Sequence, residues 1–134
     1  MPVKPETHLE AFAEHKDAIF RWALEVRGID KSQRIVGLHA SRGITELLSA
    51  MLHEKGLLPV SASLNHRWFK TIRVMDRLPP FPGREGLLKK IVELENLSED
   101  LTYGSPKAVE TIKKAIGLFM EIEKEVQRQR GDHG

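Results

Sequence analysis

Apolar residues recur at helical spacing along almost the whole chain, and this pattern restricts the fold more than any other feature of the sequence. They stand mostly three or four residues apart, which gathers them on one side of an α-helix. No stretch of five or more residues alternates apolar and polar side chains between turn signals, as a half-buried strand does. The sequence therefore predicts an all-α fold, an antiparallel bundle of four to five helices.

Glycine and proline residues divide this pattern into separate helices. The first predicted helix runs from Thr7 to a stop at Gly28. A second helix, capped by Asp30 or Ser32, continues to Gly56. Because this second helix is apolar over more than half of its circumference, we expect it at the centre of the bundle.

A short helix and a long helix are predicted next. Asn65 or Ser63 is expected to cap the short helix, which must end before the rigid connector Pro79–Gly83. The long helix covers residues 87–101 and closes at Gly104.

The last predicted helix begins with the strongest start signal in the chain. Ser105 followed by Pro106 supplies a capping residue and then a proline in the first helical position. The polar residues 127–134 at the far end are expected to fray. A chain of 134 residues suits a single helical-bundle domain over residues 1–134.

Composition and missing motifs exclude several kinds of site. The absence of cysteine removes disulfides, thiolate nucleophiles and cysteine-based metal sites. No phosphate-binding loop, dinucleotide-binding glycine pattern or HExxH zinc motif is present, so we expect no cofactor and no metal ion. No apolar run approaches the ~20 residues that span a bilayer, and the N-terminus lacks a signal-peptide core, so a soluble cytoplasmic protein without membrane contact is expected. The 21 basic and 19 acidic residues against two asparagines and three glutamines favour a thermophilic source.

A polar stripe interrupts the apolar surface of the second predicted helix. Its members follow one another at spacings of three, four, three and four residues: His39, Arg42, Glu46, Ser49 and His53. Arg42 and Glu46 are placed to pair across one helical turn. The stripe is either a solvated face with an ordinary ion pair or the wall of a polar pocket. A zinc ion shared by His39 and His53 is excluded, because they stand about 21 Å apart along the axis.

Positive charge concentrates in residues 65–90, which contain seven basic residues and only two acidic ones. The basic residues are Arg67, Lys70, Arg73, Arg77, Arg84, Lys89 and Lys90. Aromatic rings interleave with cations in Asn65–Lys70, a pattern that suits nucleic acid because rings stack on bases while cations neutralise phosphates. His66 and Arg67 stand at a predicted helix start, where backbone N–H groups favour anions. In the alternative interpretation the cations are a solvated face and the apolar members are core residues, namely Trp68, Phe69 and Ile72.

Two acidic patterns have a structural interpretation. In the segment Glu99–Gly104, Tyr103 beside the glycine is expected to close a helix, with its ring packed and its hydroxyl hydrogen-bonded. The closely spaced carboxylates elsewhere are expected to be charged helix faces, namely Glu93 with Glu95 and the series Glu121, Glu123 and Glu125.

Three parts of the chain together resemble the HEPN family of small helical nucleotide-binding domains. They are His39–Leu58, the histidine within Leu64–Phe69, and Glu95–Phe119. Their order is also similar, with a long helix ending in a Lys-Gly turn, a histidine-bearing segment, and a short polar motif that opens a long final helix.

The resemblance implies a bundle of four or five helices that forms a homodimer. It also implies a metal-independent ribonuclease or toxin, often paired with a small nucleotidyltransferase. The catalytic signature of that family is an Arg and a His separated by four to six residues. Glu99 and Tyr103 stand at those two positions here. Since a glutamate cannot stabilise phosphate charge and a tyrosine is a poor base at neutral pH, the nuclease activity is not expected.

The sequence thus predicts a non-catalytic, HEPN-like binding or regulatory module that dimerises through apolar helix faces. Its ligand is expected to be anionic, a nucleotide or an RNA phosphate, at Arg42, Glu46, His66, Arg67, Lys70, Arg73 and Tyr103. One alternative is a ribonuclease, the toxin component of a pair with a nucleotidyltransferase, that uses His66 and Arg67. Another alternative is a structural subunit of such a pair.

Overall fold

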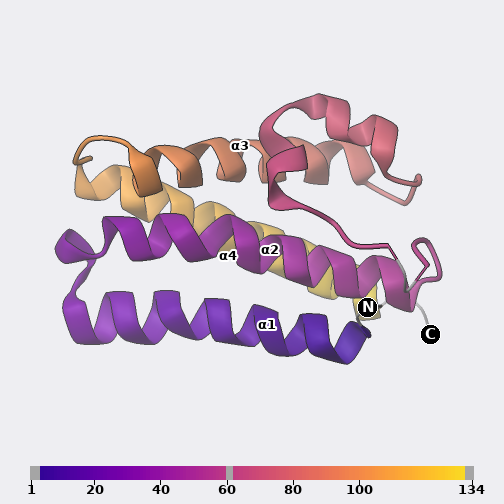
Figure 1. Cartoon of the computed structure of the whole chain (residues 1–134), viewed down its shortest axis with the longest axis horizontal. Coiled ribbons are helices and arrows are strands. Elements are labelled where there is room, and N and C mark those ends of the chain that lie inside the picture. Colours follow the sequence, from indigo (N-terminus) through magenta and orange to yellow (C-terminus); the bar gives the residue numbers. More distant parts are fainter. Residues whose placement is uncertain (1–3, 60–61, 132–134) are drawn as a thin grey trace.

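Four long helices that pack against one another make up most of the protein (Figure 1). The computed structural model describes residues 4–59 and 62–131, and no strand occurs among them. The helices are α1 (Pro5–Asp17), α2 (Gln33–Glu54), α3 (Arg84–Tyr103) and α4 (Val109–Gly131). The prediction of an all-α fold is confirmed.

The first helix is longer than its α-helical part. The chain continues from α1 through wider π-type turns, Ala18–Arg27, and stops at Gly28, as predicted. Gly28 has a φ of +88°, a conformation that residues with a side chain rarely adopt. A short 3₁₀ turn, Ile29–Lys31, then leads into α2.

Helix α2 occupies the centre of the bundle, as its wide apolar surface predicts. Fourteen of its 22 residues are buried, and it contacts α1, α3 and α4. Its apolar face is therefore largely buried within the fold. The large apolar side chains of the described residues that remain more than half exposed are Trp22, Val26, Tyr103 and Met120.

The start of the last helix differs from the prediction. Helix α4 begins at Val109 and not at Ser105-Pro106, because a distant side chain holds the preceding residues. The Gln33 amide donates to the carbonyls of Leu101 and Ser105, and its Oε1 accepts from the backbone N–H of Lys107 at 2.7 Å. The local capping signal is thus overridden by a contact from the start of α2.

The far end of α4 does not fray within the described residues, so that prediction is wrong for residues 127–131. The helix extends to Gly131, and residues 132–134 lie outside the described part of the chain. Arg130 pairs with Glu54 of α2 at 2.7 Å, and the Gln129 amide donates to the carbonyl of Pro82.

Two 3₁₀ helices replace the single short helix expected between α2 and α3. They are η3 (His66–Lys70) and η4 (Ile72–Arg77), and they are separated by Thr71 in an extended conformation. The expected cap is confirmed, because the Asn65 side chain accepts from the backbone N–H of Arg67. Phe69 is fully buried, whereas Ile72 is exposed and does not belong to the core.

A glycine lets α2 approach α3 closely. A Cβ atom at Gly37 would lie 2.8 Å from the Ser98 carbonyl oxygen, 2.8 Å from Leu101 Cβ and 2.6 Å from Thr102 Oγ1. Two of these neighbours are rigid parts of the facing helix, so a side chain at this position would push the helices apart.

None of the helices in the described residues is long and apolar enough to cross a membrane.

Substitution Gly37→Ala should lower the free energy of unfolding by about 1–3 kcal/mol, the usual cost of overpacking. The matched control is Gly117→Ala in α4, where an added Cβ meets no atom within 4 Å. That control should raise stability by about 0.5–1 kcal/mol, because alanine loses less backbone entropy in a helix. Urea unfolding of both variants measures the difference, and equal stabilisation by both would contradict the close approach at Gly37.

Candidate functional site: a polar pocket between two helices and a 3₁₀ segment

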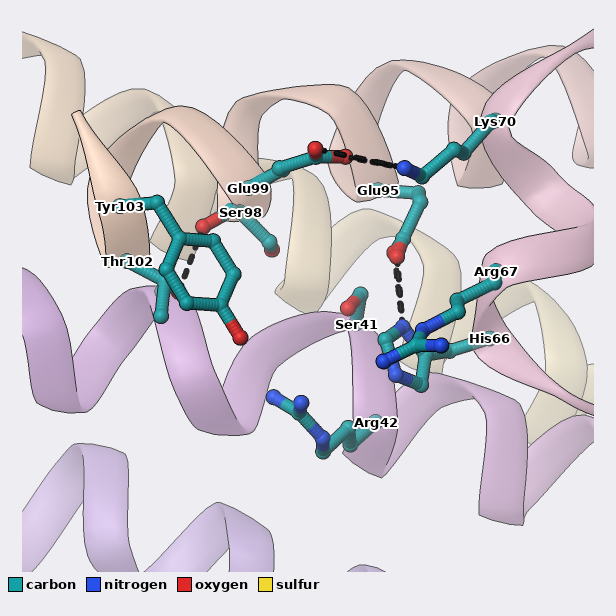
Figure 2. Close-up of a pocket in the computed structure, with 11 residues that line it drawn as sticks. Ser41, Arg42, His66, Arg67, Lys70, Glu95, Ser98, Glu99, Thr102 and Tyr103 are labelled. Atoms are coloured by element: carbon teal, nitrogen blue, oxygen red, sulfur yellow. Dashed lines mark hydrogen bonds and ion pairs between the residues drawn. The ribbon is translucent and has the colours of Figure 1, made fainter.

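A pocket of about 250 Å³ lies where α2, α3 and η3 meet (Figure 2). Tyr103 stands at one end and His66 with Arg67 at the other, while Ser41 and Ser98 lie between them. The remaining lining residues are Gly37, Arg42, Lys70, Glu95, Glu99 and Thr102. Polar and charged groups from segments far apart in the sequence therefore line one cavity.

A buried carboxylate orients the histidine of this pocket. His66 Nδ1 lies 2.6 Å from Glu95 Oε1, and Glu95 is only 3% exposed. Because a carboxylate oxygen accepts hydrogen bonds, this contact assigns the donor role to Nδ1 of His66. Nε2 has no hydrogen-bond partner within the described residues, which leaves it available in the pocket.

The start of η3 brings His66 and Arg67 to the same cavity although they are neighbours in sequence. Adjacent side chains on a regular helix diverge by about 100°. Here Asn65 caps the segment through the backbone N–H of Arg67 at 2.8 Å, and both side chains line the pocket.

Two guanidinium groups at the pocket have no acidic partner. Arg42 donates to the carbonyl of Leu38 at 2.8 Å, and the Arg67 side chain makes no hydrogen bond or ion pair in the described part of the chain. The third cation, Lys70, is paired with Glu99 at 3.1 Å. The carboxylates of the pocket are thus already engaged, and an excess of positive charge remains.

Most of the predicted site residues come together in this cavity. Arg42, His66, Arg67, Lys70 and Tyr103 all line it. Glu46 lines an adjoining pocket of about 370 Å³, which shares Arg42, His66 and Arg67 with the first. Arg73 lines neither pocket. Tyr103 ends α3 as expected, but it is not packed, because the residue is 74% exposed and its hydroxyl makes no hydrogen bond among the described residues.

The polar stripe of α2 is not a solvated face, and its expected ion pair is absent from the described residues. Glu46 pairs with His8 of α1 at 2.6 Å and not with Arg42. His53 is buried and stacks on His8 with ring centroids 5.3 Å apart. His39 contacts His15 of α1, with 2.9 Å between their Nδ1 atoms. The stripe therefore packs largely against α1, a partner that the spacing within α2 does not reveal.

Burial lowers the pKa of both His15 and His39 below the usual 6.5. For His39, repulsion from His15 and then from Arg42 adds to the effect of burial. For His15, the attraction of Glu46 partly offsets burial, and Arg42 lowers the pKa further. The folded state thus favours the neutral form of this pair.

Glu95 was expected on a charged helix face and was not predicted as a site residue. Leu88, Ile91, Glu95 and Ser98 follow one another at spacings of three, four and three residues on the buried side of α3. A carboxylate at a position where the pattern calls for an apolar residue is the signal that would have identified it. Ser41 and Ser98 were missed as well.

No family model, curated protein or solved structure matches this chain. Among the residues that the structure describes, no group of three or more His, Asp or Glu side chains is arranged to hold a metal ion.

Stability should fall as pH drops below 6.5, because the unfolded state binds protons on His15 and His39 more readily than the folded state. The stability that these residues contribute is fully present above that pH and is lost as pH falls toward their lowered pKa values. Urea unfolding across this range, compared with a His15→Asn/His39→Asn variant, isolates their share. An equally steep loss in the variant would contradict this assignment.

Proposed function

We propose that the protein is a HEPN-like binding or regulatory module whose pocket takes a phosphate-bearing ligand, a nucleotide or an RNA phosphate. The observation that carries the proposal is that the guanidinium groups of Arg42 and Arg67 line one pocket without a carboxylate partner in the described residues. A guanidinium matches the geometry of a phosphate and binds it with two parallel hydrogen bonds.

The contacts of the other cations in residues 65–90 favour a compact phosphate site over an extended surface that binds single-stranded nucleic acid. Arg77 lies over the Trp68 ring, 4.6 Å from its centroid, and so covers an aromatic face that would otherwise be free to stack on a base. Lys89 pairs with Glu85, and Lys90 pairs with Glu121. The two lysines of this segment that lie outside the pocket are therefore already paired with carboxylates.

The position of the pocket supports the HEPN-like part of the proposal. Glu99 and Tyr103, which stand where that family has its Arg and His, both line the cavity. The proposal includes a homodimer, and the alternative of a structural subunit includes a nucleotidyltransferase partner. Trp22 and Val26, four residues apart and each more than half exposed, offer an apolar surface for such an assembly.

Arg42→Ala and Arg67→Ala should each weaken the binding of adenosine monophosphate about tenfold, since a charge-assisted hydrogen bond contributes roughly 1.5–3 kcal/mol. Calorimetric titration of the purified protein at low salt measures this effect. Affinity should also fall as salt is raised, because ions screen the attraction. The matched control is Arg73→Ala, in the same basic segment but outside the pocket. An equal loss in this control, or binding that is insensitive to both pocket variants, would contradict the proposal.

A second candidate function is metal-independent RNA cleavage by His66 and Arg67. The specific observation in its favour is the Glu95 carboxylate, which orients the His66 ring from a buried position. Cleavage needs a base for the 2′-hydroxyl and a cation for the negative charge that develops on the phosphorane oxygens. His66 Nε2 and the Arg67 guanidinium are groups of those two kinds.

The leading proposal predicts no cleavage of RNA above background when the purified protein is incubated with EDTA. Gel analysis of a labelled single-stranded RNA checks this outcome. Cleavage that His66→Ala removes and Tyr103→Phe retains would replace the binding module with the ribonuclease. Cleavage lost in Tyr103→Phe instead would assign the activity to the altered family motif.

A further inference from the structure

The inner wall of the pocket carries a hydroxyl group without a partner. Ser98 is 2% exposed, and its Oγ has no hydrogen-bond partner among the described residues. Figure 2 shows its side chain pointing from α3 into the cavity, with Ser41 of α2 on the facing wall. Ser41 is 3% exposed, and its hydroxyl also makes no hydrogen bond within the described part of the chain.

This free hydroxyl is unusual for a serine inside a helix. Helical Ser and Thr side chains commonly donate to the carbonyl four residues earlier. The Ser49 hydroxyl donates in this way to the carbonyl of Thr45, and the Thr102 hydroxyl donates to the backbone carbonyl of Ser98. A buried polar group that lacks such a bond destabilises the protein unless a ligand or water satisfies it.

The inner wall of the pocket, which carries Ser98 and Ser41, differs in charge from the part that Arg42 and Arg67 line. The buried Glu95 carboxylate, which His66 holds, stands three residues before Ser98 on α3, whereas the cations Arg42 and Arg67 come from α2 and η3. A phosphate at the inner wall would meet Glu95, so the anion is better held by the arginines. Serine hydroxyls donate and accept hydrogen bonds, which suits an uncharged hydroxyl-bearing group.

We propose that the ligand is a phosphate monoester of a hydroxylated compound, with its hydroxyl groups at Ser98 and Ser41 and its phosphate at Arg42 and Arg67. This inference rests on the proposed function and adds the orientation of the ligand and the residues that select it. A ribose 5-phosphate unit has the required chemistry, either as the free sugar phosphate or within a nucleotide. In a nucleotide, the exposed Tyr103 ring at the end of the cavity offers a face for the base.

Calorimetric titrations with inorganic phosphate, ribose 5-phosphate and adenosine monophosphate test this proposal. We expect the wild-type protein to bind ribose 5-phosphate about tenfold more tightly than inorganic phosphate, as one or two added hydrogen bonds would give. Ser98→Ala should remove most of that difference, leave the affinity for inorganic phosphate unchanged and raise the melting temperature of the free protein. Ser41→Ala, on the facing helix, should weaken ribose 5-phosphate in the same selective way. Tyr103→Ala should weaken adenosine monophosphate alone if a nucleotide is the natural ligand.

The outcomes separate this inference from the proposed function. Phosphate binding that depends on Arg67, with no gain from the ribose, would overturn the inference alone. An equal loss of affinity for all three compounds in Ser98→Ala would place the phosphate at the inner wall and contradict the proposed orientation of the ligand. The absence of saturable binding of any of the three would overturn the proposed function and this inference together.

Discussion

The carboxylate of Glu95 is buried where α3 meets η3, and it holds the imidazole of His66 in place. The arrangement of the pocket depends on this contact. An ionised carboxylate removed from water is costly unless it accepts hydrogen bonds, and His66 Nδ1 at 2.6 Å supplies one. Because Arg67 and Lys70 belong to the same 3₁₀ helix as His66, fixing the imidazole also fixes the positive side of the cavity. Phe69, fully buried in the core, anchors the same segment from its apolar side.

Helix α2 supplies the facing wall because it has two polar borders around its apolar surface. One border packs on α1 through two histidine contacts, His8 with His53 and His15 with His39. The other border, with Ser41 and Arg42, faces α3 across the close approach at Gly37. The histidines of the first border therefore pack between α1 and α2, whereas residues of the second border line the pocket.

Features that depend on local sequence were predictable, and features that depend on distant contacts were not. The stop at Gly28, the cap at Asn65 and the end of α3 before Gly104 follow from residues next to them. The prediction of where α4 starts was wrong because Gln33, more than 70 residues earlier, binds the loop that precedes this helix. Periodicity alone locates polar groups on a helix but not their partners, which is why Glu46 was paired with Arg42 and Glu95 was assigned to the surface. Arg42, Arg67 and Tyr103 were predicted as members of one site, but the shape of the cavity that they line follows only from the tertiary arrangement of three segments.

The tautomer of neutral His66 tests most directly whether Glu95 organises the pocket. Long-range proton–nitrogen NMR correlations at alkaline pH, where the imidazole is uncharged, distinguish a proton on Nδ1 from one on Nε2. The structure predicts the Nδ1–H form in the wild-type protein and its loss in Glu95→Leu, which has no acceptor at that position. The Nε2–H form in the wild-type protein, unchanged in Glu95→Leu, would contradict the account.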